Sequence, residues 1–558
     1  MENILIINCN TLADVYSCVH LTNSIKHQYP NSKIHLLTFK EFRPSIKNLK
    51  NLSQIFTIDR GKISTFKKNR LFSEAFALDS FIRSIKELKT FHFDWIINYQ
   101  QNALGNYLLT YLNAENYSGI KILENKIIVP SNSHVLLNKS LQDFIHLPIH
   151  SEEMIHKITN INWNENEIKL MTDPENNKLV HENLNHFRYK INNKKPNFRI
   201  VAIQLANISN GFFKEKFLKM AVEHLEELVK LLLLDHYLHP VLIVYPNSKE
   251  ITIANKLNAT FDNSLLTIEA DVNTLPSVLV NIDILITSDY TTKKIADLLT
   301  TPTLEILDKP TPLCINSSIN PGNIILSPVI SKQSIIDAKN SSEYMFLPPG
   351  QDLYFGIYLL LSELVPPLKD HHLLPNITVY QVLKDKYGIN YKALTGDINV
   401  NFELSTQMAR YYLTKLFEKT YPVEILNNVL NIFDKHELYS WVDHEKDHIT
   451  ETVVILLETT KYLRSMNKDH ETKAQFVNSL DKLIKCCFYD SLITIPCMLF
   501  KNKLDTINSS TFDENIKKLD RLLEELKSNI QILTASLTDL TSLEYKRRGG
   551  SLIETGIF

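Results

Sequence analysis

The sequence predicts an α/β protein in which two doubly wound units follow one another and an all-α region comes after them. Short apolar runs alternate with helical patterns up to about residue 130, and the same alternation restarts near residue 197. From about residue 365 the apolar residues recur with a period near 3.6, which is typical of amphipathic helices. Strands that alternate with helices favour parallel sheets covered on both faces. We therefore expect domains at 1–190, 197–350 and 365–558.

In the first unit, each expected strand is a short apolar run and each helix repeats its apolar residues at helical spacing. The helix after the first strand, for example, has an apolar stripe through Val15, Val19 and Ile25. Residues 131–196 are less regular, and the polar stretch 184–197 is expected to be a linker. The expected elements are strands at 3–8, 33–39, 54–59 and 93–99, and helices at 14–28, 73–90 and 102–112.

The same pattern defines the second unit, and only helical periodicity defines the third. The second unit is expected to have strands at 198–205, 240–245, 265–270, 283–289 and 302–307, and helices at 216–234, 249–259, 273–282 and 291–301. The last region has five amphipathic segments, at 403–421, 423–436, 448–466, 473–488 and 514–537. We expect a bundle that packs on the α/β core, mediates self-association or recognises a protein partner. The run 514–540 is also compatible with a coiled-coil pair.

Composition narrows the class of protein. The 558 residues are 44% hydrophobic and 22% charged, with a formal net charge of −2. A nearly neutral chain lacks the basic footprint of a nucleic-acid-binding protein, so no nucleic-acid partner is expected. The six cysteines form no CxxC pair, and the chain begins with a strand-like run rather than a signal peptide. Because no run of 18 apolar residues is present, we expect a cytoplasmic protein. A contact with the inner face of the membrane is an option through the basic tail at 546–548.

Glycine is scarce, which limits how the chain can bind phosphate. Only 12 of 558 residues are glycine, against a usual share of about 7%. Neither a GxGxxG nor a Walker A sequence is present. Any phosphate must therefore be held by helix N-termini and side chains. His444 and His448 are spaced as metal ligands could be, but a solvated polar helix face is the favoured interpretation, and no metal site is expected.

Asp14 is the first candidate functional residue. It lies in "NTLADVYSCV" (10–19), where the first strand passes into the first helix. In open parallel sheets, ligands bind outside the carboxyl ends of the strands, so Asp14 should face the cleft between the two units. One interpretation is a general base that deprotonates an acceptor hydroxyl. The other is a carboxylate that only complements the helix dipole.

The second candidate stretch is "DILITSDYTTKKIADLLTTPTLEIL" (283–307). Here a strand ends at Asp289 and a helix begins with two hydroxyls and two lysines. Free backbone amides at this helix start would suit a diphosphate, and the lysines would add positive charge. The alternative is an ordinary capped helix with solvated lysines. The candidate donor-binding residues here are Asp289, Thr291, Thr292, Lys293 and Lys294.

Four stretches, in order, resemble glycosyltransferase family 9, the ADP-heptose:lipopolysaccharide heptosyltransferases. "TLADV" and "YPNSKIHLLTF" are similar to the family's opening "xxLGDV" loop and "YPxAxIxxLV". "FDWIINYQQNALGNYLLTYLNAENYSGI" is similar to "YDLVIDLQGNxRSxxLxxLxxxxxRIG". "LPSVLVNIDILITSDYTTKKIADLLTTPTLEIL" is similar to "LAALLxxADLVVGxDSGPxHLAAALGTPTVALF". The resemblance covers roughly residues 3 to 310.

The resemblance implies a GT-B fold of two Rossmann-like domains, with the donor nucleotide bound mainly by the second. It implies inverting transfer of a heptose or related sugar from a nucleotide diphosphate to a glycan, lipopolysaccharide or protein acceptor. It further implies no cofactor and no tightly held metal. Asp14 matches the family's catalytic aspartate, and Asp289 matches the acid that opens the donor motif.

The sequence departs from the family at the donor site. The family's donor turn has a glycine where this chain has Thr291, and a histidine where it has Lys294. Asn210 stands at the place of a family lysine, and Glu250 corresponds only loosely to a nucleotide contact. The second hypothesis is therefore a catalytically degenerate GT-B-like protein that binds or scaffolds through its helical region. Either protein could be a homo-oligomer.

Overall fold

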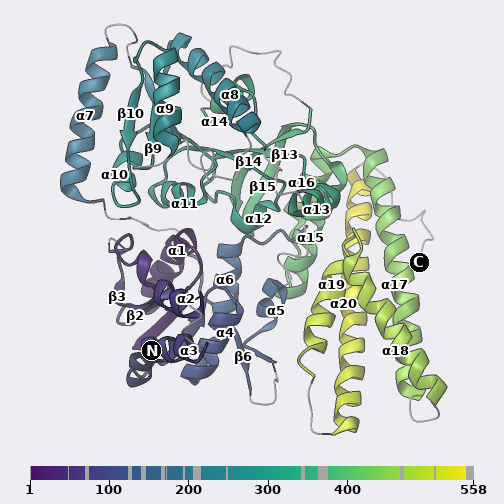
Figure 1. The fold of residues 1–558 in the computed structure, drawn as a ribbon. Helices are drawn as coiled ribbons and strands as arrows, with labels where there is room; N and C mark the ends of the chain where they lie inside the picture. Colours follow the sequence, from purple (N-terminus) through teal and green to yellow (C-terminus); the bar gives the residue numbers. More distant parts are fainter. Residues whose placement is uncertain are drawn as a thin grey trace. The chain divides into compact units, whose positions relative to one another are not determined.

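The computed structural model of the chain confirms the predicted fold class. It describes residues 2–47, 49–68, 74–123, 128–139, 146–164, 170, 172–192, 195, 197–204, 215–246, 249–340, 346–361, 375–465, 470–507 and 511–547. Two compact units can be distinguished (Figure 1). The α/β unit comprises residues 1–119 and 150–398 and contains both doubly wound sheets, whereas the helical unit comprises residues 120–149 and 399–558. In the described part of the chain, no helix is long and apolar enough to cross a bilayer.

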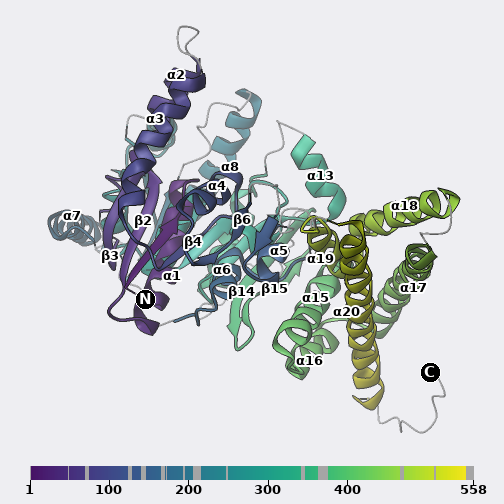
Figure 2. The ribbon, with the colours of Figure 1, turned by 90° about the horizontal axis from the view of Figure 1, so that it is seen from below.

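The first sheet is parallel throughout, with strand order β3-β2-β1-β4-β5. Its strands are β1 (Asn3–Ile7), β2 (Lys33–Phe39), β3 (Leu52–Ile58), β4 (Trp95–Asn98) and β5 (Asn116–Ser118). The connecting helices are α1 (Leu12–Gln28), α2 (Arg60–Lys68), α3 (Glu74–Lys86) and α4 (Ala103–Leu112), with short 3-10 turns at Lys40–Phe42 and Glu87–Thr90. Helices α2 and α3 lie side by side (Figure 2). Strand order reverses between β1 and β4, and open parallel sheets bind ligands at the carboxyl ends of the strands at such a point.

The second sheet has the order β10-β9-β8-β11-β12-β13-β14-β15, and its strand order reverses between β8 and β11. Its parallel strands are β8 (Arg199–Gln204), β9 (Leu238–Val244), β10 (Leu266–Glu269), β11 (Ile284–Thr287), β12 (Thr303–Ile306) and β13 (Ile324–Pro328). The helices of this part are α8 (Glu215–Leu234), α9 (Lys249–Thr260), α10 (Leu275–Leu279), α11 (Tyr290–Leu299), α12 (Leu313–Asn316), α13 (Lys332–Asn340) and α14 (Gly350–Leu360).

Two strands extend this sheet beyond the expected boundary. The prediction of helix from residue 365 onward is wrong for β14 (Ile377–Asp385) and β15 (Gly388–Gly396), which form an antiparallel hairpin on the edge of β13. Gly388 has φ of +111°, and a Cβ there would approach Glu153 Oε1 to 1.9 Å, so the turn requires glycine. Glu153 in turn accepts the Ile389 amide at 2.7 Å, which ties α6 (Ser151–Thr159) to the hairpin.

The stretch expected to be a linker is mostly helical. Helix α7 (Pro174–Asn192) includes most of residues 184–197, so the prediction of a linker is wrong there. Leu184 is buried in the same apolar cluster as Ile200 and Leu285 of the second sheet, and Val180 and Phe187 pack against that cluster. Apolar residues at helical spacing within a polar stretch therefore stabilise a helix through tertiary packing.

The helical unit is built around one long helix. Helix α20 (Phe512–Arg547) packs against α15 (Val400–Glu418), α17 (Lys435–Ser465) and α19 (Thr494–Leu504). Its buried leucines include Leu526, Leu533 and Leu540, seven residues apart. The segment considered for a coiled-coil pair is thus a single helix within a bundle. The other elements of this unit are β6 (Ile120–Ile122), β7 (Ile128–Pro130), α5 (Ser133–Lys139), α16 (Val423–Ile432), α18 (His470–Lys485) and the 3-10 turn Cys486–Phe488.

Residues 120–149 belong to the helical unit, although the sequence placed them in the first domain. Asn502 donates to the carbonyl oxygen of Leu136 at 2.8 Å, and Lys139 pairs with Asp505 at 2.9 Å. These contacts join residues 366 positions apart, so no local pattern could have indicated them.

Glu445 of α17 makes the stability of the helical unit depend on pH. Its carboxylate is 1% exposed and accepts the Ser491 hydroxyl at 2.6 Å and the Leu492 amide at 2.9 Å. Burial, outweighing these hydrogen bonds, raises the pKa of Glu445 from 4.5 to about 7. Because the folded-state pKa lies above the unfolded value, its stabilising contribution is complete below about pH 4.5 and is lost as pH rises through about 7.

We expect Glu445→Gln to remove this pH dependence, since a neutral amide oxygen can accept the same hydrogen bonds. Between pH 4.5 and 8, the free energy of unfolding of the wild type should fall by about 3 kcal/mol more than that of the variant. Urea unfolding followed by circular dichroism measures both. Glu471→Gln, an exposed site on α18, is the matched control and should follow the wild type. Parallel pH profiles for wild type and Glu445→Gln would contradict the prediction.

Candidate active site

The switch points of the two sheets lie at the first turns of two helices that pack together. Helix α1 follows the central strand β1, and α11 follows β11, each at its sheet's switch point. The two helices pack against each other within the α/β unit. The Tyr290 hydroxyl of α11 donates to Asp14 Oδ1 of α1 at 3.4 Å. One carboxylate oxygen of Asp14 therefore contacts the first residue of α11, the helix that follows β11 of the second sheet.

Asp14 also caps its own helix. Its carboxylate therefore both complements the start of α1 and contacts α11. Thr11 is the N-cap of α1, and its hydroxyl accepts the Asp14 amide at 3.2 Å. In return Asp14 Oδ2 accepts the Thr11 amide at 3.2 Å and the Asn10 side-chain amide at 2.7 Å. This reciprocal pair is a capping box. One carboxylate oxygen thus fixes the helix start, and the other is directed toward Tyr290.

Asn8 holds the loops around Asp14 in place. Its side chain is fully buried, and its Nδ2 donates to the Asp14 carbonyl oxygen at 2.7 Å. Gln100, from the loop after β4, donates to Asn8 Oδ1 at 2.6 Å. The two loops on either side of the switch point are therefore linked through one buried amide.

The start of α11 is a capped helix whose lysines are not solvated. Asp289 is the N-cap, and its Oδ1 accepts the Thr292 amide at 2.7 Å. In the described part of the chain, no hydrogen bond engages the amides of Tyr290 and Thr291. Two backbone donors therefore remain at this helix start, where the dipole favours an anion.

Both lysines expected to contact a diphosphate are buried in ion pairs instead. Lys293 is 4% exposed and pairs with Glu305 of β12. Lys294 is 2% exposed and pairs with Glu152 of α6 at 2.5 Å. The physical reason is that a buried ammonium requires a counter-charge, and each lysine has one within reach. The sequence predicted that these two amines contact phosphate directly, but both are buried and paired with carboxylates.

Around Lys294 lies a buried cluster of charged and imidazole groups. Glu152 is 2% exposed, and its Oε2 lies 3.6 Å from Nε2 of His20 of α1. Burial alone would raise the pKa of Glu152, but the Lys294 charge and hydrogen bond, together with smaller effects of neighbouring groups, lower the pKa to about 2. Burial likewise opposes the charged form of Lys294, yet Glu152 raises its pKa. This pair is therefore fully ionised at neutral pH.

Three histidines in this cluster are neutral at neutral pH. Burial lowers the pKa of His20 and His156 to about 4 and that of His150 to about 3. Neutral imidazoles beside the ion pair leave its charge balance unchanged, so the cluster stabilises one arrangement of α1, α6 and α11.

Tyr290 covers the cluster. Its ring centroid lies 5.1 Å from the Lys293 amine and 5.6 Å from the Lys294 amine, which is within cation–π range. Burial, outweighing the Lys294 ammonium, raises the pKa of Tyr290, so its hydroxyl stays protonated and can donate to Asp14. Nearby, the buried Tyr99 hydroxyl has no hydrogen-bond partner in the described structure. Tyr290 and Tyr99 thus present two phenols to the surroundings of Asp14.

Two further residues were predicted to bind the donor, Glu250 and Asn210. Glu250 is 4% exposed in the first turn of α9, where it accepts the Tyr245 amide at 2.7 Å. It lies at the carboxyl edge of the second sheet, at the start of the helix that follows β9. Asn210 falls outside the described residues.

Sequence reasoning missed Glu152 and the role of Tyr290. Tyr290 was visible as the residue between Asp289 and Thr291, but the family pattern drew attention to its neighbours. Glu152 carries no signal of its own, because its two partners lie 142 and 132 positions away.

Comparison with known proteins finds similar solved structures. No protein-family profile matches the sequence, and no curated protein matches it. Among solved structures, a glycosyl transferase of family 9 from Veillonella parvula is similar with a TM-score of 0.48 and 12% identity, over 65% of this chain and 98% of the other. ADP-heptose lipopolysaccharide heptosyltransferase II of E. coli is similar with a TM-score of 0.42 and 12% identity, over 65% of this chain and 99% of the other.

A third similar structure is E. coli heptosyltransferase WaaC with ADP-2-deoxy-2-fluoro heptose. Its TM-score is 0.37 at 13% identity, over 56% of this chain and 90% of the other. These proteins are of the kind that the sequence motifs resemble, but at such identities and TM-scores the likeness carries no argument about the activity of this chain.

Proposed function

We propose that this chain is an inverting glycosyltransferase that moves a heptose or related sugar from a nucleotide-diphosphate donor to an acceptor hydroxyl. The observation that carries the proposal is the position of Asp14. Its partly buried carboxylate stands at a switch point, with Oδ2 fixed by the helix cap and Oδ1 directed toward α11. The ordered motif resemblance over residues 3 to 310 supports the same assignment.

In this mechanism Asp14 Oδ1 accepts the proton of the acceptor hydroxyl as its oxygen attacks the anomeric carbon of the donor sugar. The bond from that carbon to the diphosphate oxygen breaks, and the diphosphate leaves with the bonding electrons. The amides of Tyr290 and Thr291 at the start of α11 stabilise the developing negative charge. Asn8 and Thr11 hold Asp14 in place, and the Lys294–Glu152 pair holds α11 without contacting phosphate.

The acceptor is a glycan, a lipopolysaccharide or a protein in this proposal. A place at the inner face of the membrane would follow for a lipid-linked acceptor. Tyr290 would have to leave Asp14 for the acceptor hydroxyl to enter, and its 3.4 Å contact is long enough to be exchanged readily.

Donor binding is the experiment that tests this function. We expect one class among ADP-, GDP- and UDP-sugars to raise the melting temperature of the full chain. A ligand at 100 times its Kd contributes about 2.7 kcal/mol. Ribose 5-phosphate is the control for non-specific anion effects. A flat response to every nucleotide sugar at millimolar concentration would reject the glycosyltransferase assignment.

The ring of Tyr290, which lies over the amines of Lys293 and Lys294, favours a second function. Tyr290 contacts both buried amines and Asp14, and it occupies the position that a donor would approach. This arrangement suits a catalytically degenerate GT-B-like protein that works through its helical unit. A flat thermal response together with retained partner binding by the helical unit would favour this alternative.

A further inference from the structure

Two buried thiols of the helical unit lie next to each other, and the proposed function does not use them. All six cysteines of the chain fall within the described residues, and all are free and buried. Cys486 begins the 3-10 turn that follows α18, whereas Cys497 lies on α19, and both are 0% exposed. A side-chain hydrogen bond joins the two sulfur atoms. These cysteines are therefore a candidate dithiol pair rather than two isolated core residues.

Hydrogen bonds hold the 3-10 turn against the first turn of α19. The Thr494 hydroxyl donates to the Tyr489 carbonyl oxygen at 2.8 Å and lies 3.5 Å from the Cys486 carbonyl oxygen. Cys497 follows Thr494 by about one helical turn, so the two side chains share one face of α19. The face of α19 that meets the turn is thus the face that carries Cys497, which brings its sulfur toward Cys486.

The two thiols differ in acidity. The hydrogen bond from Cys497 is the largest influence on the pKa of the Cys486 thiol and lowers it, against the opposing effect of burial. Hydrogen bonds from Thr452 and Tyr489 lower it further. The same bond between the two sulfurs, together with burial, raises the pKa of Cys497. Burial raises the pKa of three other thiols to about 12, those of Cys9, Cys314 and Cys487. The nucleophilic thiolate form is therefore concentrated at Cys486, beside a protonated thiol.

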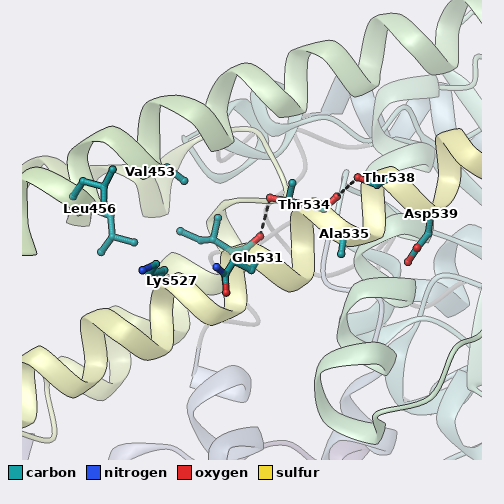
Figure 3. Close-up of a pocket in the computed structure, with 10 residues that line it drawn as sticks. Val453, Leu456, Lys527, Gln531, Thr534, Ala535, Thr538 and Asp539 are labelled. Carbon is teal, nitrogen blue, oxygen red and sulfur yellow. Dashed lines mark hydrogen bonds between the residues drawn. The ribbon is translucent and has the colours of Figure 1, made fainter. Parts of the chain in front are cut away.

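Cys486 lies just beneath a surface turn. Lys485 before it is exposed, and Phe488 after it is 57% exposed. A single 3-10 turn at the surface opens locally at a lower free energy than the long helices that surround it. By contrast, the pocket of about 470 Å³ between α17 and α20 has no cysteine among the described residues that line it (Figure 3). A small oxidant therefore has its shortest path to Cys486 through the turn.

We propose that Cys486 and Cys497 are a modification site, which a hydroperoxide oxidises to an intramolecular disulfide. The Cys486 thiolate attacks the terminal oxygen of the peroxide. The sulfur–oxygen bond forms as the oxygen–oxygen bond breaks, and the alkoxide or hydroxide leaves and takes a proton from water. The sulfur of Cys497 then attacks the Cys486 sulfenic acid, and the sulfenic oxygen leaves as water with the proton of Cys497. The sulfur pair loses two electrons, and the peroxide gains them.

The resulting disulfide joins the end of α18 covalently to α19. The proposal does not depend on the proposed sugar transfer, because both cysteines belong to the helical unit.

Peptide mapping of the full chain after treatment with hydrogen peroxide tests the proposal. Chymotrypsin cleaves after Phe488 and Tyr489, which lie between the two cysteines, so only a disulfide keeps the peptides of Cys486 and Cys497 together. We expect this linked peptide from the wild type, and its loss after reduction. Cys487→Ser is the matched control, since it removes the adjacent buried thiol, and it should form the same link at the wild-type rate.

Variants of the pair separate the roles of the two sulfurs. Cys497→Ser should leave a sulfenic acid at Cys486, which dimedone traps. Cys486→Ser should slow the oxidation of Cys497 by about tenfold or more, because the remaining thiol is protonated. Circular dichroism melts establish that each variant is folded, and Cys497→Ala takes the place of Cys497→Ser if the buried hydroxyl unfolds the chain.

A native wild type that keeps both thiols under peroxide, while the same treatment in urea oxidises them, would overturn the proposal, because the pair would then be inert in the fold. A Cys486→Ser variant that links Cys487 to Cys497 as fast as the wild type links its pair would also overturn it, since Cys486 would not be the nucleophile.

Discussion

Asp14→Asn is expected to lower the rate of sugar transfer by about 10³-fold, while the free energy of unfolding falls by less than about 1 kcal/mol. The reason is that the two oxygens of Asp14 have different partners. An asparagine oxygen in place of Oδ2 can still accept the Thr11 amide, so most of the helix cap survives. The uncharged side chain, however, cannot take a proton from the acceptor hydroxyl.

The matched control is Asp94, whose carboxylate accepts backbone amides at the other end of the sheet from Asp14. Asp94 precedes β4 and accepts the amides of Glu2 and Asn3 at 2.7 and 3.0 Å. Asp94→Asn should leave turnover within about threefold of the wild type, because it removes only a hydrogen-bond acceptor of similar strength. The measurement is initial rate on the donor identified by thermal shift. If Asp14→Asn keeps more than a tenth of wild-type turnover, Asp14 is a helix cap and not the base.

The strand-to-helix junction that carries Asp14 could be predicted because it depends on local patterns. The apolar run ending at Ile7 and the helical stripe through Val15 and Val19 place the residue at a strand-to-helix junction. The rule for parallel sheets then places that junction at the crevice. The capping box adds a local constraint of the same kind, since Thr11 and Asp14 are three residues apart.

The lysines of α11 could not be interpreted in the same way. Whether an ammonium is solvated or paired depends on residues brought near by the fold. Glu305 is 12 positions from Lys293, but Glu152 is 142 positions from Lys294 and lies on another helix. A sequence shows two cations at a helix start, and only the fold shows that their charges are already balanced.

The β14–β15 hairpin was missed for a different reason. Its β-branched and aromatic residues, such as Val379 and Tyr380, and the turn glycine Gly388 are a recognisable hairpin signal. The strong helical periodicity on its carboxyl side dominated the interpretation of the whole region. A window ending at Gly396 would have separated the two patterns.

Glu152→Gln is expected to lower the free energy of unfolding of the α/β unit by about 3–5 kcal/mol. The substitution leaves the Lys294 ammonium 2% exposed beside a neutral amide. Its cost is mainly that of an uncompensated buried charge. Urea unfolding followed by tryptophan fluorescence measures the change, in a Trp441→Phe background that leaves Trp95 and Trp163 of this unit as the reporters. Asp79→Asn breaks the exposed Arg83–Asp79 pair and should cost less than about 0.5 kcal/mol.

The paired variant separates the ion pair from the packing around it. Glu152→Leu/Lys294→Met removes both charges, and apolar replacement of a buried pair is often neutral. We therefore expect the double variant to be more stable than either Glu152→Gln or Lys294→Met. Because the folded pKa of Glu152 is lowered to about 2, the pair's contribution is present above about pH 4.5 and lost as pH falls through about 2. The gap between wild type and Glu152→Gln should narrow accordingly in acid. Two outcomes would mean that the two charges are not coupled and that α11 is held by apolar packing alone. One is a double variant whose loss in free energy of unfolding is the sum of the single losses. The other is a difference in free energy of unfolding between wild type and Glu152→Gln that does not change with pH.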